Sequence, residues 1–390
     1  MMNRDYDVIV VGGGPAGAMA AHIAAEDGAK TLLLERDSHI GLPVRCGEGV
    51  SIGNIRQLVE VDDRLIAHEM NSAVIYAPDD TAVEIPLASS AVVLERALFD
   101  RYLAELAASS GADIQTRSDV TGLTENNGCI NGITYNRFGR EMSLKCGVVI
   151  GADGVESRVG KWAGLKTKIK SFDMESAYQM VLSGIDINHR NFHFYVGNEI
   201  APGGYIWVFP KGETTANVGI GVKSSMCSPG DAYKKLIEFI EKHFGKPVVV
   251  GESAGGVPCG PPLKEPLTDG LILVGDAARH CNPLSGGGIC SGMISGKEAG
   301  SVAAMAVSKG DVSKRCLGAF NKRIEKKIVR SHKRAYRLSL AVNKLDDSVF
   351  LKTAHEMIKI PVEDRNLRNV FLKALISSPS LVVDIVKMFV

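Results

Sequence analysis

Three glycines near the start of the chain have the spacing of a turn that binds a dinucleotide. Gly12, Gly14 and Gly17 fit the pattern G-x-G-x-x-G. Glycines at these positions permit a tight turn, a close approach of the backbone to a pyrophosphate, and close packing of a helix on a strand. Glu35 follows at the distance expected for a residue that hydrogen-bonds the ribose hydroxyls. These residues predict a dinucleotide site rather than a glycine-rich turn without a ligand, but they do not separate FAD from NAD.

A second stretch, far along the chain, carries groups suited to a flavin. An apolar run ends in Gly275 and Asp276, and the glycines 286–288 precede a long segment of small residues. The Asp276 carboxylate can accept a hydrogen bond from a ribityl hydroxyl, and the glycine turn offers backbone N–H groups to a reduced flavin ring. Alone, the stretch also fits a buried aspartate that caps the next helix. Two nucleotide-facing turns at opposite ends of the chain imply one extended ligand, so we predict FAD.

The elements around these turns have the pattern of a parallel sheet with covering helices. Residues 8–11 form a β-branched run, Pro15 suits the first turn of a helix over 16–25, and residues 30–34 form a second strand. Together they make a βαβ unit. Further strands are expected at 147–151 and 271–274, and helices at 94–108, 231–244 and 289–306. No second G-x-G-x-x-G lies on a recognisable βαβ unit, so we expect no separate NAD(P) domain.

Alternating aromatic residues mark a candidate substrate surface. Between 176 and 222 the chain has short strands with aromatics and glycines, which predict an antiparallel sheet. Tyr205, Trp207 and Phe209 alternate and therefore project from one face of a strand. Three rings on one face form a wall for a long apolar ligand. Ordinary packing of the sheet explains the same pattern.

Composition narrows the class of protein. The 390 residues include 45 basic and 44 acidic side chains, and this balance argues against general nucleic-acid binding. The eight cysteines form no C-x-x-C pair and no cluster at metal-ligand spacing, so we expect reduced thiols, no metal and a cytoplasmic protein. We expect no signal peptide and no membrane span. Cys46 lies in a glycine-rich loop, where its thiol could line a pocket, donate a proton or fill space.

One segment departs from the overall charge balance. Residues 314–337 contain ten Lys or Arg and one acidic residue, Glu325. Such runs are usually solvated faces, but this excess favours a surface that holds anionic headgroups at a membrane. We therefore expect peripheral membrane association, with His332, Lys333 and Arg337 near a lipid phosphate or the bilayer.

Several motifs resemble known families. Three spaced stretches resemble the FAD-dependent oxidoreductases built like p-hydroxybenzoate hydroxylase. They are Gly12–Gly17 with Glu35, Gly151-Ala-Asp-Gly154, and Gly275-Asp276. Two other stretches are more specific: Pro43-Val-Arg-Cys-Gly-Glu-Gly49, and Tyr205-Ile-Trp-Val-Phe-Pro-Lys211 with Gly219 and Gly221 downstream. Both resemble the geranylgeranyl reductase family, most closely the archaeal digeranylgeranylglycerophospholipid reductases. The second also resembles the Trp-x-Trp-x-Ile-Pro of flavin halogenases, from which Tyr205 and Phe209 depart.

The resemblance, which extends to about Arg337, implies roles for matching residues. The FAD-binding positions would be Gly12, Gly14, Ala16, Gly17 and Glu35 at the first turn; Cys46, Gly47 and Gly49 along the flavin; Arg96 near the pyrophosphate; Val120 near the adenine; and Asp276, Gly287, Gly288 and Ile289 at the ribityl chain and ring. The substrate would contact Tyr205, Trp207, Phe209 and His332. Cys46 would be the catalytic candidate.

The implied fold is α/β: a Rossmann-like FAD domain with an inserted antiparallel sheet and a C-terminal helical region. The expected FAD domain is discontinuous and comprises residues 1–70, 91–170 and 262–312. The expected substrate domain comprises 71–90 and 171–261, and the helical region 313–390.

The implied reaction is saturation of isoprenoid carbon–carbon double bonds in a lipid substrate. Hydride would come from reduced FAD, and the electron donor would be NAD(P)H, ferredoxin or another reductant. Two alternatives remain open: an aromatic-hydroxylase-type monooxygenase that consumes oxygen, and a non-catalytic flavoprotein that carries prenyl lipids.

Overall fold

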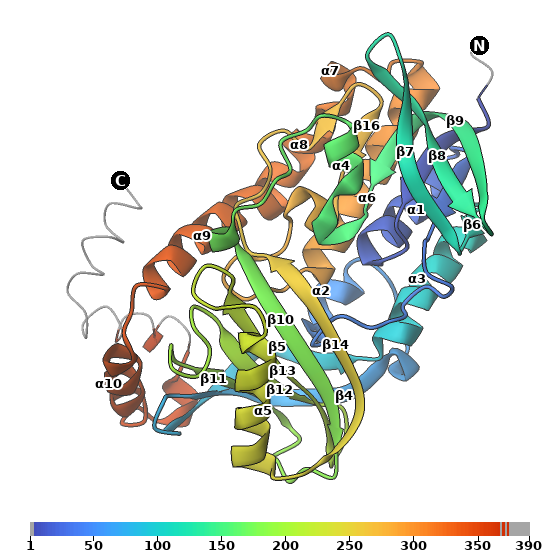
Figure 1. Cartoon of the computed structure of the whole chain (residues 1–390). Helices are drawn as coiled ribbons and strands as arrows, with labels where there is room; N and C mark the ends of the chain where they lie inside the picture. The colour runs from blue at the N-terminus through green and yellow to red at the C-terminus, as the bar shows by residue number, and fades with distance from the viewer. Residues whose placement is uncertain (1–3, 367–368, 371–372, 374–390) are drawn as a thin grey trace. The chain divides into compact units, whose positions relative to one another are not determined.

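The computed structural model describes residues 4–366, 369–370 and 373 (Figure 1). The chain divides into two compact units, each assembled from three segments. The first unit comprises residues 1–44, 96–169 and 258–335, and the second comprises 45–95, 170–257 and 336–390. Residues 45–70 therefore belong with the second sheet rather than the first, because β3 (Gly49–Ser51) and β4 (Ile66–Tyr76) both hydrogen-bond to β5 (Ala82–Leu94).

The sheet of the first unit is built on parallel pairing around the first strand. β1 (Tyr6–Val11) lies between β2 (Thr31–Leu34) and β9 (Arg140–Gly151), and β6 (Asp113–Gln115) and β16 (Leu271–Leu273) extend the sheet on the two sides. β15 (Leu267–Thr268) adds an antiparallel edge. This arrangement confirms the predicted βαβ unit and the Rossmann-like class.

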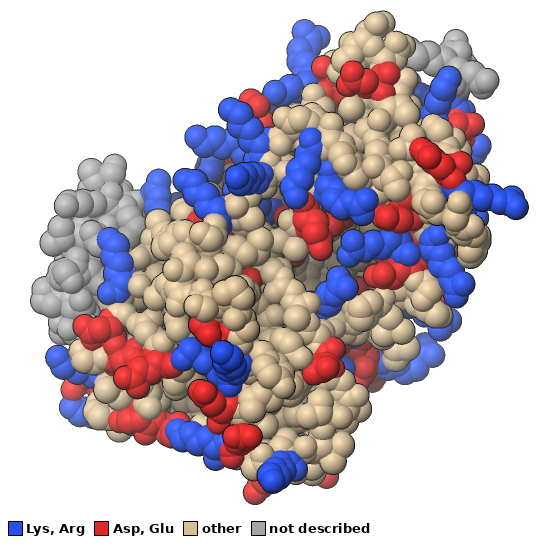
Figure 2. All heavy atoms as spheres, in the orientation of Figure 1, with Lys and Arg blue, Asp and Glu red and all other residues tan. Residues whose placement is uncertain are grey.

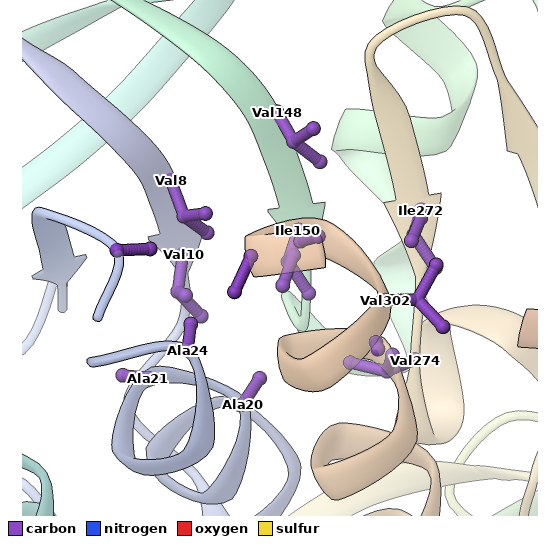
Figure 3. Close-up of a cluster of buried hydrophobic side chains, with 14 of the residues drawn as sticks. Val8, Val10, Ala20, Ala21, Ala24, Val148, Ile150, Ile272, Val274 and Val302 are labelled. Atoms are coloured by element: carbon purple, nitrogen blue, oxygen red, sulfur yellow. The ribbon is translucent and has the colours of Figure 1, made fainter. Parts of the chain in front are cut away.

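Helices cover one face of this sheet. α1 (Pro15–Glu26) and α6 (Ile289–Lys309) lie side by side, and α3 (Arg96–Ser109) packs on α1. Valines and isoleucines of β1, β9 and β16 point toward small side chains of α1 and toward Val302 of α6 (Figure 3). Alanines on α1 let the helices approach the sheet closely and leave no room for larger side chains.

The other face carries a second layer of strands. β7 (Ser118–Asn126) and β8 (Cys129–Arg137) form an antiparallel pair, and β8 forms a hairpin with β9. Buried residues of this layer, including Tyr135, pack against Ile9 and Val149. The turn after β9 continues into η2 (Gly154–Glu156) and α4 (Arg158–Trp162).

The basic segment forms a run of short helices after α6. These are α7 (Lys314–Leu317), α8 (Ala319–Ile324), a π-helical turn at Glu325–Val329 and α9 (Arg330–Val342). Glu298 of α6 pairs with Arg323 at 3.4 Å and with Lys327, which attaches α8 and the π-helical turn to the first unit.

The sheet of the second unit has eight strands in the order β14-β10-β13-β12-β11-β4-β5-β3. The strands not yet given bounds are β10 (Met174–Ser183), β11 (Asn191–Val196), β12 (Tyr205–Pro210), β13 (Thr215–Lys223) and β14 (Val248–Pro258). Pairing is antiparallel except between β4 and β11. The sheet is therefore mixed rather than wholly antiparallel as predicted, because β4 comes from an earlier segment of the chain.

Helices of the second unit pack on the sheet and complete the fold. α5 (Asp231–Phe244) packs on β10 and β13, and its Leu236, Phe239 and Ile240 join one core with the buried side chains of those strands. α10 (Asp347–Met357) packs on β5. The remaining short elements are α2 (Ile52–Arg56), η1 (Asp63–Leu65), η3 (Ser171–Asp173), η4 (Gly275–Ala278) and η6 (Val362–Asp364).

Among the described residues, no helix has both the length and the apolar character that crossing a bilayer requires.

Candidate functional site

The glycine turn between β1 and α1 is tightly packed on one side and open on the other. Gly12 has a φ of 106°, and a Cβ there would lie 2.4 Å from the carbonyl oxygen of Ala152. A Cβ at Gly17 would lie 1.9 Å from the carbonyl oxygen of Gly12. Gly14, at the N-cap of α1, has no atom within 4 Å of such a Cβ, and no side chain caps the helix. The first N–H groups of α1 thus have the open approach that a pyrophosphate requires.

Glu35 lies at the end of β2, beside this turn. Its Oε2 accepts a hydrogen bond from the Gly13 N–H at 2.7 Å, and its Oε1 accepts one from the Asp37 N–H at 2.8 Å. Two backbone donors fix the carboxylate next to the turn, and each oxygen keeps a second lone pair for another donor. The geometry suits ribose binding, which stays a prediction.

The two predicted nucleotide turns meet, although they lie at opposite ends of the chain. A Cβ at Gly275 would lie 2.9 Å from the Cβ of Ala16, and a Cβ at Gly292 would lie 3.5 Å from it. Farther along, a Cβ at Gly296 would lie 2.0 Å from the carbonyl oxygen of Ala16. The backbones of α1 and α6 are therefore in direct contact, and small residues on both helices bring the turns together.

Asp276 follows β16, and its carboxyl is enclosed by protein although the residue keeps some exposed surface. A Cβ at Gly288 would lie 3.1 Å from Asp276 Oδ1, so the carboxyl adjoins the glycine turn that opens α6. Burial raises the pKa of Asp276 to about 6, and the Arg96 guanidinium opposes this rise. Arg96 itself forms a bidentate ion pair with Asp100, with both N–O distances at 2.7 Å. If Arg96 binds a pyrophosphate, its guanidinium would therefore contact both the phosphate and Asp100.

Three further predicted positions lie in the first unit. Val120 is buried on β7, and Ile289 is buried at the first residue of α6. Gly287 lies in the turn before α6, with its Cβ position 3.4 Å from Ser285 Oγ. Their contacts with adenine and flavin stay predictions. In the described residues, no three His, Cys, Asp or Glu side chains gather as metal ligands.

The aromatic residues of β12 share one face of the second sheet, as the alternation predicted. Tyr205, Trp207 and Phe209 are partly exposed, whereas Ile206 and Val208 are buried in the core beneath α5. Phe192 and Phe194 of β11 join the same face. The ring centroids of Phe192 and Phe209 lie 4.7 Å apart, and those of Phe194 and Tyr205 lie 5.6 Å apart. The five rings form one surface, which we call the aromatic face.

The loop around Cys46 lies directly on the aromatic face. A Cβ at Gly47 would lie 3.1 Å from the Phe209 ring and from Trp207 Nε1. A Cβ at Gly49 would lie 3.1 Å from the rings of Phe192 and Phe209. The glycines predicted to line the flavin are therefore also needed for close packing of this loop on aromatic rings. Cys46 is half-buried, and its contact with a flavin stays a prediction.

Trp207 is held flat over the neighbouring strand. A Cβ at Gly219 would lie 2.2 Å from Trp207 Cζ2, so only glycine on β13 leaves room for the indole. Trp207 Nε1–H donates to Gln179 Oε1 at 3.0 Å, and Gln179 Nε2–H donates to the Cys46 carbonyl oxygen at 3.0 Å. Gln179 therefore links the two family-specific motifs.

An ion pair links the same motifs at their other ends. Lys211 Nζ lies 2.7 Å from Glu48 Oε2 and 3.1 Å from Glu95 Oε2. Asn217 Nδ2–H donates to Glu48 Oε2 at 2.6 Å. Glu48 and Lys211 lie within the two family-specific motifs, but no role was predicted for either. Opposite charges in two separated motifs were the signal that could have paired them.

Comparisons with known proteins bear on this arrangement. A digeranylgeranylglycerophospholipid reductase of Methanocella arvoryzae is 39% identical to this chain over 389 residues, which cover 99% of each protein. The chain belongs to the digeranylgeranylglycerophospholipid reductase family. The Methanothrix thermoacetophila member is 42% identical over 366 residues, covering 93% of this chain and 94% of the relative.

Solved structures agree with this membership. A geranylgeranyl bacteriochlorophyll reductase-like protein of Thermoplasma acidophilum superposes with a TM-score of 0.92 and 35% identity, covering 98% of each chain. A flavin-dependent brominase has a TM-score of 0.72 at 18% identity, with 98% of each chain covered, and shares the fold.

Two family models match the parts of the chain that carry the candidate sites. An NAD(P)-binding Rossmann-like domain matches residues 10–51, which include the glycine turn, Glu35 and the loop around Cys46. The geranylgeranyl reductase catalytic domain matches residues 173–257, which include β10 to β13 and the aromatic strand. In this reductase family member, the catalytic-domain match therefore falls on the sheet that bears the aromatic face.

His332, predicted to lie near a lipid phosphate or the bilayer, is buried, unlike the exposed basic residues around it; its contact with lipid stays a prediction. It is 7% exposed, and its Nδ1 has no hydrogen-bond partner among the described residues. It is close enough to His280 to lower the pKa of that buried histidine, whose ring lies 6.3 Å from that of Phe320. His332 falls on the inner side of α9 because the helix turns its charged neighbours Lys333 and Arg334 to solvent.

Proposed function

We propose that this chain is an FAD-dependent reductase that saturates the double bonds of geranylgeranyl chains in archaeal membrane lipid precursors. The observation that carries the proposal is the match of the geranylgeranyl reductase catalytic domain to the sheet with the aromatic face. Family membership at about 40% identity over nearly the whole chain supports it. The substrate would be a digeranylgeranylglycerophospholipid, as the names of the relatives indicate.

The residues of the first unit fit FAD. The open backbone at Gly14 suits the pyrophosphate, Glu35 suits the adenosine ribose, and Asp276 beside Gly288 suits the ribityl chain. The contact of Ala16 with Gly275 and Gly292 supports one extended ligand across both turns. Bound reduced FAD would supply hydride for one alkene carbon while a proton reaches the other.

The residues of the second unit would hold the isoprenoid. An unactivated alkene has no carbonyl to polarise, so the protein contributes mainly by positioning the double bond. The rings of Tyr205, Trp207 and Phe209 offer a rigid apolar surface for such a chain. The Cys46 thiol would position the alkene or donate the proton.

Anaerobic turnover tests the proposal. Dithionite-reduced protein is mixed with a geranylgeranyl phospholipid, and the lipid is analysed by mass spectrometry for a gain of two mass units per reduced double bond. Product that forms only with oxygen would instead indicate a monooxygenase. Bound FAD that the lipid never reoxidises would indicate a carrier. Repeating the reaction with NADH, NADPH or reduced ferredoxin in place of dithionite identifies donors that the enzyme accepts.

The basic segment supports a second part of the proposal, binding to an anionic membrane. All ten Lys and Arg side chains of residues 314–337 are exposed, and blue side chains gather over α8 and α9 (Figure 2). Within the described part of the chain, Lys322, Lys326, Lys333 and Arg334 form no ion pair that would neutralise them. Each such charge near an anionic surface contributes about 1 kcal/mol.

Co-sedimentation with vesicles tests this part. We expect binding to vesicles containing phosphatidylserine and much weaker binding to pure phosphatidylcholine. Replacing Lys322, Lys326, Lys333 and Arg334 by alanine should reduce binding to the anionic vesicles. Replacing four exposed lysines elsewhere by alanine should not, and suitable control positions are Lys145, Lys234, Lys246 and Lys264. Equal binding to both vesicle types would contradict the proposal.

A further inference from the structure

The loop from Arg45 to Gly49 is held by polar side chains of the second sheet. Its two glycines give it little conformational preference of its own. Gln179 Nε2–H donates to the Cys46 carbonyl oxygen at 3.0 Å, and Asn217 Nδ2–H donates to the Gly47 carbonyl oxygen at 3.2 Å. Consecutive peptide carbonyls of the loop are thus fixed by β10 and β13, strands of the sheet that bears the aromatic face.

Glu48 provides the third and strongest attachment. It is only 2% exposed, and its Oε2 accepts hydrogen bonds from Lys211 Nζ at 2.7 Å and from Asn217 Nδ2–H at 2.6 Å. Charge-assisted hydrogen bonds of this length are roughly twice as strong as neutral ones. Removing one partner of a buried ion pair leaves an uncompensated charge, so the loop cannot leave the sheet without a large penalty.

The backbone of Glu48 connects this attachment to the thiol. Glu48 has a φ of 69°, a left-handed conformation that is unfavourable for residues other than glycine. In this conformation the Glu48 N–H donates to Cys46 Sγ at 3.2 Å, and the Glu48 carbonyl oxygen accepts from the Leu94 N–H at 3.0 Å. The side-chain ion pair stabilises a strained backbone whose N–H points at the sulfur.

We propose that Glu48 is a positioning residue that fixes the Cys46 thiol for alkene reduction, with Lys211 and Asn217 locking its carboxylate. The role in reduction rests on the proposed function, whereas the placement of the thiol does not. Glu48 acts through Cys46, so removing both residues should cost no more than removing one. A side chain that only stabilises the fold would show independent effects on turnover.

A double-mutant cycle on turnover tests this role. We expect Glu48→Ala and Cys46→Ala each to reduce kcat by about tenfold, and the double variant also by about tenfold rather than a hundredfold. KM for the lipid should change little, because the aromatic rings remain. Glu48→Gln should recover most of the activity, since one amide oxygen can accept from both Lys211 and Asn217. Additive effects of the two alanine variants on kcat would overturn the proposal.

A second measurement does not depend on turnover. The rate at which iodoacetamide alkylates Cys46 is followed by peptide mass spectrometry, with the half-buried Cys227 of the same unit as reference. Glu48→Ala should change the Cys46 rate at least threefold relative to Cys227, and Glu48→Gln should restore it.

The two measurements separate the possible failures. An unchanged Cys46 rate in Glu48→Ala would overturn the proposal even if no lipid is reduced. A changed rate with Cys46→Ala fully active would contradict the role of the thiol in the reaction and leave its positioning by Glu48 in place. If Glu48→Ala does not fold, Asn217→Ala and Lys211→Met replace it in both experiments.

Discussion

A buried pair of histidines makes the stability of this protein sensitive to acid. His280 is 1% exposed, and neither of its ring nitrogens has a hydrogen-bond partner among the described residues. Burial and the neighbouring His332 lower the pKa of His280 to about 3. Burial also lowers the pKa of His332. The His280 ring is therefore neutral in the folded protein over the range in which a solvated histidine takes up a proton.

The sign and size of the effect follow from proton linkage. In the unfolded chain His280 titrates near 6.5. Below that pH the unfolded state binds a proton that the folded state does not, so the free energy of unfolding decreases as pH falls from 6.5 toward 3. The slope from one such histidine is about 1.4 kcal/mol per pH unit, which amounts to roughly 2–3 kcal/mol between pH 6.5 and 4.5.

The variant His280→Phe removes this contribution while keeping an aromatic ring beside Phe320. In urea unfolding at several pH values, the free energy of unfolding of the variant should decrease less steeply below pH 6.5 than that of the original chain. The slopes should differ by about 1.4 kcal/mol per pH unit, the contribution of one proton. At pH 7.5 the variant should be at least as stable as the original chain, because two unpartnered ring nitrogens no longer have to be buried.

The exposed His39 supplies the matched control, because His39→Phe makes the same substitution at the protein surface. A slope for His280→Phe equal to that of the unsubstituted protein would refute the reasoning, because it would mean that His280 binds a proton in the folded state.

Two glycine contacts give further predictions. Gly219→Ala should displace the Trp207 indole, because the new Cβ would lie 2.2 Å from Cζ2. In a Trp162→Phe background, the tryptophan fluorescence maximum reports Trp207 alone. An unshifted maximum would contradict the predicted displacement. Gly296→Ala should separate α6 from α1 and lower Tm by roughly 5 °C, with loss of flavin absorbance on gel filtration. Gly292→Ala on the same helix is the control for Tm, since its Cβ position is 3.5 Å from the nearest atom; equal values of Tm for these two variants would refute the argument.

The elements that carry local signals were predictable from the sequence. The turn at Gly12 and the helix Asp231–Phe244 were found where expected, because glycine spacing and amphipathic periodicity are short-range properties. The contact of Ala16 with Gly275 is consistent with the inference that both turns face one extended ligand, and that ligand stays a prediction. The alternation at Tyr205 correctly predicted a shared face for three aromatic residues.

Features that depend on long-range packing were not predictable in the same way. The burial of His332 depends on the rotation of α9 about its own axis, and a helix so rich in charge gives little indication of its inner side. The pairing of β3 with β5 moved residues 45–70 to the second sheet. The contact of Glu48 with Lys211 joins positions more than 160 residues apart, and no periodic pattern links them.

The direct contact of α1 with α6 also constrains how the chain folds during synthesis. α1 ends at Glu26 and α6 begins at Ile289. At typical translation rates, roughly 10 to 50 s pass before the ribosome has produced the partner of the first helix. Until then the side of α1 that contacts α6 has no partner, although α3 and the first strands can already pack on the helix. Because such non-local contacts form late and slowly, the dinucleotide site should be among the last parts of the protein to mature.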